Sequence, residues 1–127
     1  MTLERELLLM QDFRKVKAWQ ANRLLTVRIY RVTAAFPREE RFGLTSQMRD
    51  AVVSIGANIA EGCGRGSSAD THRFFQMSFG SAVELLHHLI TALDLGYLTQ
   101  EQHESLETEL SSIRRMTAGF MKKLKQA

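Results

Sequence analysis

The sequence predicts an all-α protein, an antiparallel up-down-up-down bundle of four helices. Only one proline and eight glycines occur among the 127 residues, which leaves long stretches free to form helices. In those stretches apolar residues recur three or four positions apart, the spacing of one helix face. No long stretch alternates between apolar and polar residues, and no Asn-Gly or Asp-Gly dipeptide marks a β-hairpin. Short connections then force successive helices to run antiparallel.

The first helix is expected over residues 13–36. Pro37 ends it, because proline lacks a backbone N–H and disfavours a helical conformation in the residue before it. Helical spacing in this stretch is carried by Phe13, Val16, Leu24, Val27 and Ala35.

The second helix is expected to begin at Thr45, since threonine caps helix N-termini. Gly62 is expected to end it, because glycine readily adopts the left-handed conformation of a C′ residue. The apolar stripe between these ends consists of Met48, Val52, Ile55 and Ile59.

The third helix is expected to begin at Ser67 or Ser68, either of which can accept a hydrogen bond from the first turn. Gly96 is the candidate C′ residue at its other end. The fourth helix follows residues 99–102, "TQEQ", a capping box in which Thr99 and Gln102 exchange hydrogen bonds. Its apolar stripe, interrupted by Thr117, consists of Leu106, Leu110, Ile113, Phe120 and Leu124.

Two of the expected helices are more apolar than a four-helix bundle requires. Residues 51–60, "AVVSIGANIA", carry no charge, so this part of the second helix is expected to be buried on every side. Apolar side chains cover more than half the circumference of the third helix, whereas a bundle needs an apolar face of only about 100° per helix. The excess predicts a homo-oligomer built on the second and third helices.

The charges are unevenly spread along a chain whose net charge is only +3. Residues 1–49 carry ten basic and five acidic side chains, residues 50–113 two and nine, and residues 114–127 five and none. This asymmetry fits either a nucleic-acid footprint or solvated helix faces whose charges match the helix dipoles. Cys63 is the single cysteine, and no apolar run has the length of a signal peptide or a membrane span, so the cytoplasm is the expected compartment.

The stretch "NIAEGCGRGSS", residues 58–68, has the composition of a phosphate-binding loop. Its glycine spacing and the helix before it fit neither a P-loop nor a dinucleotide-binding fingerprint. Two interpretations remain: an anion held by free N–H groups at the start of the third helix beside Arg65, or a turn between two helices. In the second, the turn is held by a polar clasp of Asn58, Glu61, Gly62 and Arg65.

No set of residues predicts catalysis, a metal site or a cofactor. The histidines, His72, His87, His88 and His103, have no carboxylate or cysteine at a recognisable ligand spacing. Cys63 lies at a helix C-terminus, where the dipole disfavours a thiolate, and has no identifiable histidine partner. Trp19 and Tyr30 are expected to anchor packing, with stacking on nucleic-acid bases as the alternative. The protein is therefore expected not to be an enzyme.

Residues 13–98 resemble a family of four-helix-bundle proteins encoded in intervening sequences of bacterial 23S ribosomal RNA genes. The stretches that carry the resemblance are "FRKVKAWQ", "IYRVTAAFPREERFGLTSQMRDAVVSIGANIAEGCGRGS" and "FFQMSFGSAVELLHHL". The resemblance implies an antiparallel four-helix bundle that assembles as a ring of five and is not an enzyme. Residues 1–12 lie outside the family pattern, as an N-terminal extension to a single domain over residues 13–125.

The function expected from these observations is a non-catalytic homo-oligomer that binds RNA or another nucleic acid through basic helix faces. These faces belong to the first and fourth expected helices, and the named candidate contacts lie on the fourth: Arg114, Arg115, Lys122, Lys123 and Lys125. The alternative is a protein-interaction scaffold, or an accessory subunit of a protein encoded nearby, that binds no nucleic acid. Neither expectation includes a membrane or a small-molecule substrate.

Overall fold

A computed structural model of the chain describes residues 12–125 and confirms the all-α class. Four long α-helices occur in this part of the chain, and none of its residues lies in a strand. In order, the elements are η1 (Phe13–Lys15), α2 (Lys17–Ala34), η2 (Arg38–Glu40), α3 (Leu44–Cys63), α4 (Ser68–Asp94) and α5 (Gln100–Lys125).

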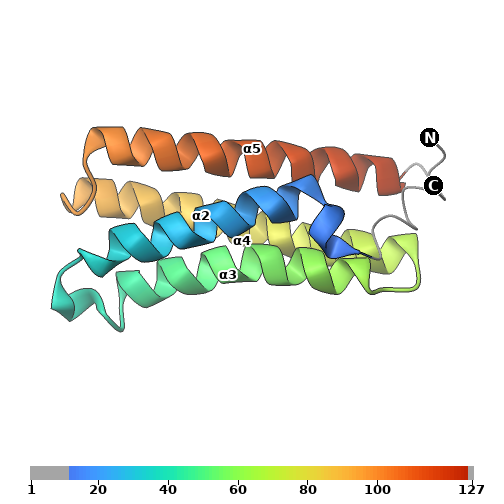
Figure 1. Cartoon of the computed structure of the whole chain (residues 1–127), viewed down its shortest axis with the longest axis horizontal. Coiled ribbons are helices and arrows are strands. Elements are labelled where there is room, and N and C mark those ends of the chain that lie inside the picture. The colour runs from blue at the N-terminus through green and yellow to red at the C-terminus, as the bar shows by residue number, and fades with distance from the viewer. Residues whose placement is uncertain (1–11, 126–127) are drawn as a thin grey trace.

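The four helices lie side by side along one long axis (Figure 1). Helix α3 packs against α2 and α4, and α5 packs against α4 and α2, so each helix has two neighbours. The start of α2, the end of α3, the start of α4 and the end of α5 all lie at the same end of the molecule in Figure 1. Segments from opposite ends of the sequence therefore meet there.

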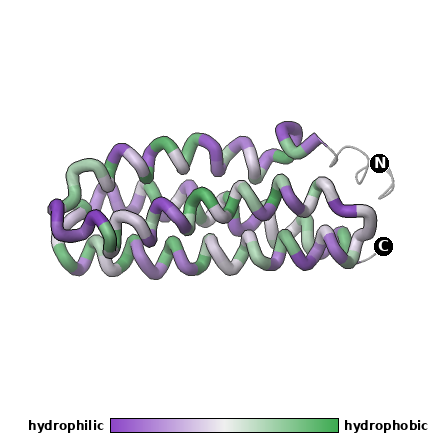
Figure 2. The backbone as a smooth tube through the Cα atoms, turned by 90° about the horizontal axis from the view of Figure 1, so that it is seen from below, coloured by the Kyte–Doolittle hydropathy of each residue, from purple (hydrophilic) through white to green (hydrophobic). Residues whose placement is uncertain are grey.

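The core runs along the centre of the bundle and takes large side chains from all four helices. Hydrophobic and hydrophilic residues alternate along each helix in Figure 2, because only one face of each helix points inward. Complete burial of one such side chain contributes about 1.5–3 kcal/mol. The largest fully buried residues are Leu25, Ile29, Met48, Val52, Ile55, Ile59, Phe75, Leu85, Leu89, Leu106, Leu110 and Ile113.

Gly62 does not end α3, so the predicted C′ position was wrong. The helix continues through Cys63, and Gly96, with φ +78°, is the one glycine with positive φ in the described part of the chain. A Cβ atom on Gly62 would lie 3.0 Å from Cβ of Phe74 and 3.1 Å from the Phe75 ring. Gly62 is present because α3 and α4 approach each other closely there, which apolar periodicity does not reveal.

The start of α3 also differs from the prediction. The helix begins at Leu44 after Gly43, and Thr45 is a buried helical residue instead of the N-cap. The carboxylate of Glu40 accepts a hydrogen bond from the backbone N–H of Leu44 at 3.2 Å. The side chain of Glu40, four residues upstream, thus satisfies a backbone N–H at the start of the helix, where the sequence predicted Thr45 as the cap.

The first helix is shorter at both ends than the predicted range 13–36, because Phe13–Lys15 form the separate element η1 and α2 ends at Ala34. The predicted ends of α4 and the start of α5 are confirmed. Ser67 caps α4, and its Oγ accepts a hydrogen bond from the N–H of Asp70 at 3.1 Å. Thr99 and Gln102 form the capping box of α5, with hydrogen bonds of 3.1 and 2.9 Å. Gly96 follows α4 in the left-handed conformation expected of a C′ residue.

The helix surfaces leave apolar side chains uncovered in a single chain. The prediction that residues 51–60 are buried on all sides was wrong for one chain, because Val53 is 47% exposed and Ala57 is also exposed. On α4, Val83 and Ile90 are 42% and 46% exposed. Within the described residues, every helix is too short or too polar to cross a membrane.

Candidate nucleic-acid interface

The fold separates the charges into two halves of the bundle. A boundary across the helices follows from contacts between them: Gly56 on α3 lies against Asn22 on α2, and Phe79 on α4 lies against Arg114 on α5. Residues 12–23, 57–79 and 114–125 lie on one side of it. This basic half carries eleven basic and three acidic side chains, a net charge of +8. The acidic half, residues 24–56 and 80–113, carries five basic and nine acidic side chains, a net charge of −4.

The three carboxylates of the basic half are each paired with an arginine. Asp12 lies 2.9 Å from Arg14, Glu61 lies 2.7 Å from Arg65, and Asp70 lies 3.0 Å from Arg73. The hydrogen bond from Arg14 holds the pKa of the Asp12 carboxyl below its usual value. The excess positive charge consists of the other cations of this half: Lys15, Lys17, Arg23, Arg114, Arg115, Lys122, Lys123 and Lys125.

The structure adds two residues to the predicted contacts on α5. Lys15 and Lys17, before and at the start of α2, are exposed at the end of the bundle where α5 ends. The sequence predicted a contribution from basic residues of the first helix but did not single these two out, because most of the chain separates them from the end of α5. The helix order would have indicated their position. When four helices are joined by three chain reversals, the start of the first helix and the end of the last lie at the same end of the bundle.

The predicted contact residues on α5 do not have equal access to solvent. Arg115, Lys122, Lys123 and Lys125 are exposed, whereas Arg114 is half-buried. The guanidinium carbon of Arg114 lies 5.7 Å from the centroid of the Phe79 ring, and its Nε is buried without a hydrogen-bond partner within the described residues. Arg114 therefore packs α5 against α4 instead of facing solvent.

The turn between α3 and α4 has only part of the predicted clasp. Arg65 bonds to Glu61 at 2.7 Å, and its guanidinium carbon lies 4.4 Å from the centroid of the Phe74 ring. Asn58 does not reach the turn, because it donates to the carbonyl and hydroxyl oxygens of Ser54, both at 3.0 Å. Thr71, which sequence reasoning missed, donates to the carbonyl of Gly62 at 2.9 Å and joins α4 to the end of α3.

The same turn is poorly suited to bind an anion. Ser67 already caps the first turn of α4, and the carboxylate of Asp70 lies in that turn. The Oδ2 atom of Asp70 lies 3.8 Å from Nε of Arg65. Arg65 also forms an ion pair with Glu61. The positive groups near the helix N-terminus are thus balanced by carboxylates, so the glycine-rich stretch connects the two helices.

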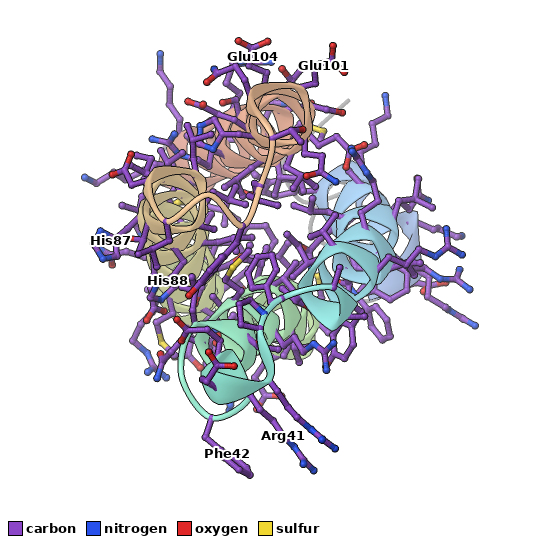
Figure 3. The ribbon with its side chains drawn as sticks, turned by 90° about the vertical axis from the view of Figure 1, so that its left-hand side faces the viewer. Arg41, Phe42, His87, His88, Glu101 and Glu104 are labelled. Carbon is purple, nitrogen blue, oxygen red and sulfur yellow. The ribbon has the colours of Figure 1, made fainter. Side chains whose placement is uncertain are left out.

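The cysteine is protonated, and the histidines do not gather into a metal site within the described residues. Burial, followed by the negative charge of Asp12, raises the pKa of the Cys63 thiol to about 11, so it carries its proton at neutral pH. The rings of His87 and His88 touch on α4, with centroids 5.3 Å apart (Figure 3). Within residues 12–125, no group of three or more His, Cys, Asp and Glu side chains could hold a metal ion.

The aromatic side chains of the basic half are engaged in packing. Trp19 and Phe13 meet edge to face with centroids 4.9 Å apart, and the centroids of Phe75 and Phe120 are 5.3 Å apart. Phe74 lies beneath the guanidinium groups of Arg65 and Arg73. No aromatic residue of the described basic half is exposed.

The exposed apolar side chains belong mainly to the other half of the bundle. Met77, 43% exposed, is the one large hydrophobic residue exposed in the described basic half. Phe42, which is 86% exposed, points away from the bundle beside Arg41 at the turn between α2 and α3 (Figure 3). The large exposed hydrophobic residues of the acidic half are Leu24, Val27, Tyr30, Phe42, Val53, Val83, Ile90 and Leu95.

Comparison with known proteins identifies a family and solved structures with a similar fold. A family model described as 23S rRNA-intervening sequence protein matches residues 14–119. No curated protein matches the chain. The fold is similar to the crystal structure of a Bacteroides thetaiotaomicron protein of unknown function from the S23 ribosomal protein family, with 25% sequence identity and a TM-score of 0.77. The similarity covers 83% of this chain and 95% of that one.

Proposed function

We propose that this chain, which belongs to the 23S rRNA-intervening sequence protein family, is a non-catalytic, cytoplasmic homo-oligomer that binds RNA or DNA through its basic half. The observation that carries the proposal is the net charge of +8 gathered in half of a chain whose total is only +3. Phosphate groups are the ligands that such a surface attracts most strongly, because each contact releases condensed counterions.

The exposed cations of the basic half are available for phosphate contacts. Lys15, Lys17, Arg115, Lys122 and Lys125 are exposed and form no ion pair within the described residues. Their charges come from two segments that lie at the same end of the molecule, the start of α2 and the end of α5. Association with a polyanion is therefore expected to be strongest at low ionic strength.

The oligomer in this proposal is a ring of five antiparallel bundles, as the resemblance to the family implies. The exposed apolar side chains of the acidic half support it, since a soluble protein rarely leaves so many uncovered. Sedimentation velocity at micromolar concentration tests it, and a species of 14.5 kDa would contradict it. Ile90→Glu should shift the protein toward the monomer, whereas Met77→Glu in the basic half should not.

Charge neutralisation tests the binding proposal. The variant Arg115→Gln, Lys122→Gln, Lys125→Gln removes three exposed cations from the basic half. The matched control Arg31→Gln, Arg38→Gln, Arg41→Gln removes three exposed cations from the acidic half. We expect the first variant to bind a fluorescent RNA hairpin at least about tenfold more weakly, with little change for the control. Equal losses in both variants would contradict a specific basic surface.

A protein-interaction scaffold without nucleic-acid binding is the second candidate. The observation that favours it is Phe42, because an aromatic side chain at 86% exposure on a turn is typical of a partner contact. Native purification distinguishes the two functions. A defined protein partner together with a protein-like 260/280 nm absorbance ratio would favour the scaffold, and co-purified nucleic acid would favour the first proposal.

A further inference from the structure

We infer that the basic half binds double-stranded nucleic acid through its phosphates and does not read the base sequence. The inference rests on the proposed function, since it names the class of nucleic acid that the same surface takes. Three observations support the inference: the position of the aromatic rings in the basic half, the type of its cations, and the negative charge of the adjoining acidic half.

Single-strand binding proteins place exposed aromatic rings along a basic groove, and successive bases stack on them. The described basic half has no exposed ring, because Phe13 and Trp19 pack edge to face and Phe75 packs against Phe120. Phe74 is 8% exposed and is covered by two arginines. The rings of the basic half are thus buried or half-buried in packing contacts, so we expect phosphate attraction to outweigh stacking, which is worth about 1–3 kcal/mol per base on an exposed ring.

Phosphate attraction alone favours a duplex over a single strand. Double-stranded DNA carries one charge per about 1.7 Å of axis, and its binding depends more steeply on salt per contact than binding of a single strand does. A surface that acts only through charge gains most from the polymer with the higher charge density. The bases of a duplex are also already stacked on one another, so the missing protein rings cost the complex nothing.

Outside the three arginine–carboxylate pairs, most exposed cations of the basic half are lysines. Lys15, Lys17, Lys122 and Lys125 are exposed, and the exposed arginines are Arg23 on α2 and Arg115 on α5. Lysine acts as a flexible point charge, whereas specific base recognition in the major groove relies on planar, bidentate groups such as arginine, asparagine and glutamine. Contacts of this kind position a duplex without distinguishing one sequence from another.

The acidic half limits where a duplex can lie. Its net charge of −4 repels phosphates, and it begins near the level of Arg23 on α2 and Arg114 on α5. A duplex is therefore expected to cross the basic end of the bundle instead of following its long axis. This geometry keeps the exposed apolar residues of the acidic half available for other contacts.

The test compares affinities by fluorescence anisotropy in about 100 mM salt. The probes are a 20-base-pair RNA duplex, the DNA duplex of the same sequence, and the unstructured strands U20 and dT20. We expect both duplexes to bind at least about tenfold more tightly than either single strand, because the surface acts by charge density. The RNA and DNA duplexes show whether A-form or B-form geometry is preferred.

Two further readouts separate this inference from the function on which it rests. Three duplexes of unrelated sequence should have dissociation constants within about twofold of one another, as phosphate contacts predict. Emission of Trp19, the single tryptophan, should change little on binding U20, because its ring is packed against Phe13. Tighter binding of U20 or dT20, or strong quenching of Trp19 by them, would overturn the inference and leave nucleic-acid binding standing. Failure of every probe to bind would overturn the proposed function as well.

Discussion

Gly62 lets α3 pack closely against α4, because it has no Cβ atom. A Cβ there would lie 3.0 Å from Cβ of Phe74 and 3.1 Å from the Phe75 ring, closer than packed carbon atoms normally approach. We expect Gly62→Ala to lower the free energy of unfolding by about 1–3 kcal/mol, measured by urea denaturation.

The matched control for that change is Gly119→Ala. Gly119 lies within α5, and a Cβ on it would meet no atom within 4 Å. Alanine is a better helix former than glycine, so this change should raise the free energy of unfolding by up to about 1 kcal/mol. Destabilisation by Gly119→Ala equal to that by Gly62→Ala would contradict the steric explanation.

Cys63 should make the stability of the protein depend on alkaline pH. Burial raises the pKa of its thiol from 9.0 to about 11, so the folded state holds the proton more tightly than the unfolded state does. The contribution is complete below pH 9 and is lost as the pH rises toward 11, by up to about 2–3 kcal/mol. Cys63→Ala should lack this part of the pH dependence. The measurement is the difference in unfolding free energy between the two proteins at pH 8 and pH 10.5, and a constant difference would contradict the prediction.

Single-residue environments were the hardest feature to predict from the sequence. Gly62 looks like a helix end in the sequence, but its role comes from two phenylalanines on the next helix. Arg114 looks like a surface cation, but it packs over Phe79. Both depend on contacts between helices, which helical periodicity does not contain.

At the scale of the elements, the side chain of Glu40 joins two turns of the bundle. One turn connects α2 to α3, and the other connects α4 to α5. Glu40 accepts a hydrogen bond from Leu44 N–H at 3.2 Å and another from the hydroxyl of Tyr97 at 3.0 Å. The hydrogen bond to the Glu40 carboxylate raises the pKa of Tyr97, because the carboxylate stabilises the protonated hydroxyl. Glu40 therefore links the start of α3 to the turn between α4 and α5.

A double-mutant cycle should detect this link. We expect Glu40→Ala and Tyr97→Phe to be coupled by about 1 kcal/mol in the free energy of unfolding, the usual size of a partly exposed hydrogen bond. Glu39→Ala is the control, because Glu39 is the exposed neighbour and does not contact Tyr97 through a hydrogen bond within the described residues. A coupling near zero for the pair of Glu40 and Tyr97 would contradict the link.

The sequence predicts helix ends well where the cap is local. Ser67, Thr99 and Gly96 act within three residues of the helix they cap, and each was predicted. Thr45 was predicted wrongly because Glu40 supplies the hydrogen bond at the start of α3 from across a turn. Element ends therefore follow from sequence only when their hydrogen bonds are formed by adjacent residues.

At the scale of the whole molecule, helix order converts a modest charge asymmetry along the chain into two unlike halves. The basic segments 12–23 and 114–125 are distant in sequence but lie on the same side of the bundle. Apolar periodicity predicts the four helices, and the basic end of α5 is visible in the sequence. The position of Lys15 and Lys17 at the same end as the cations of α5 depends on the packing of the helices, so the sequence could indicate basic residues of the first helix but could not single these two out.

The salt dependence of nucleic-acid binding tests the central claim most directly, that exposed cations of the basic half contact phosphates. The measurement is the slope of log K against log salt concentration for the 20-base-pair duplex, with the native protein and with the variant Arg115→Gln, Lys122→Gln, Lys125→Gln. If all three cations contact phosphates, the slope should be steeper than about −2.7 for the native protein and shallower by about 2.7 for the variant. A slope near zero, or the same slope for both proteins, would contradict the claim.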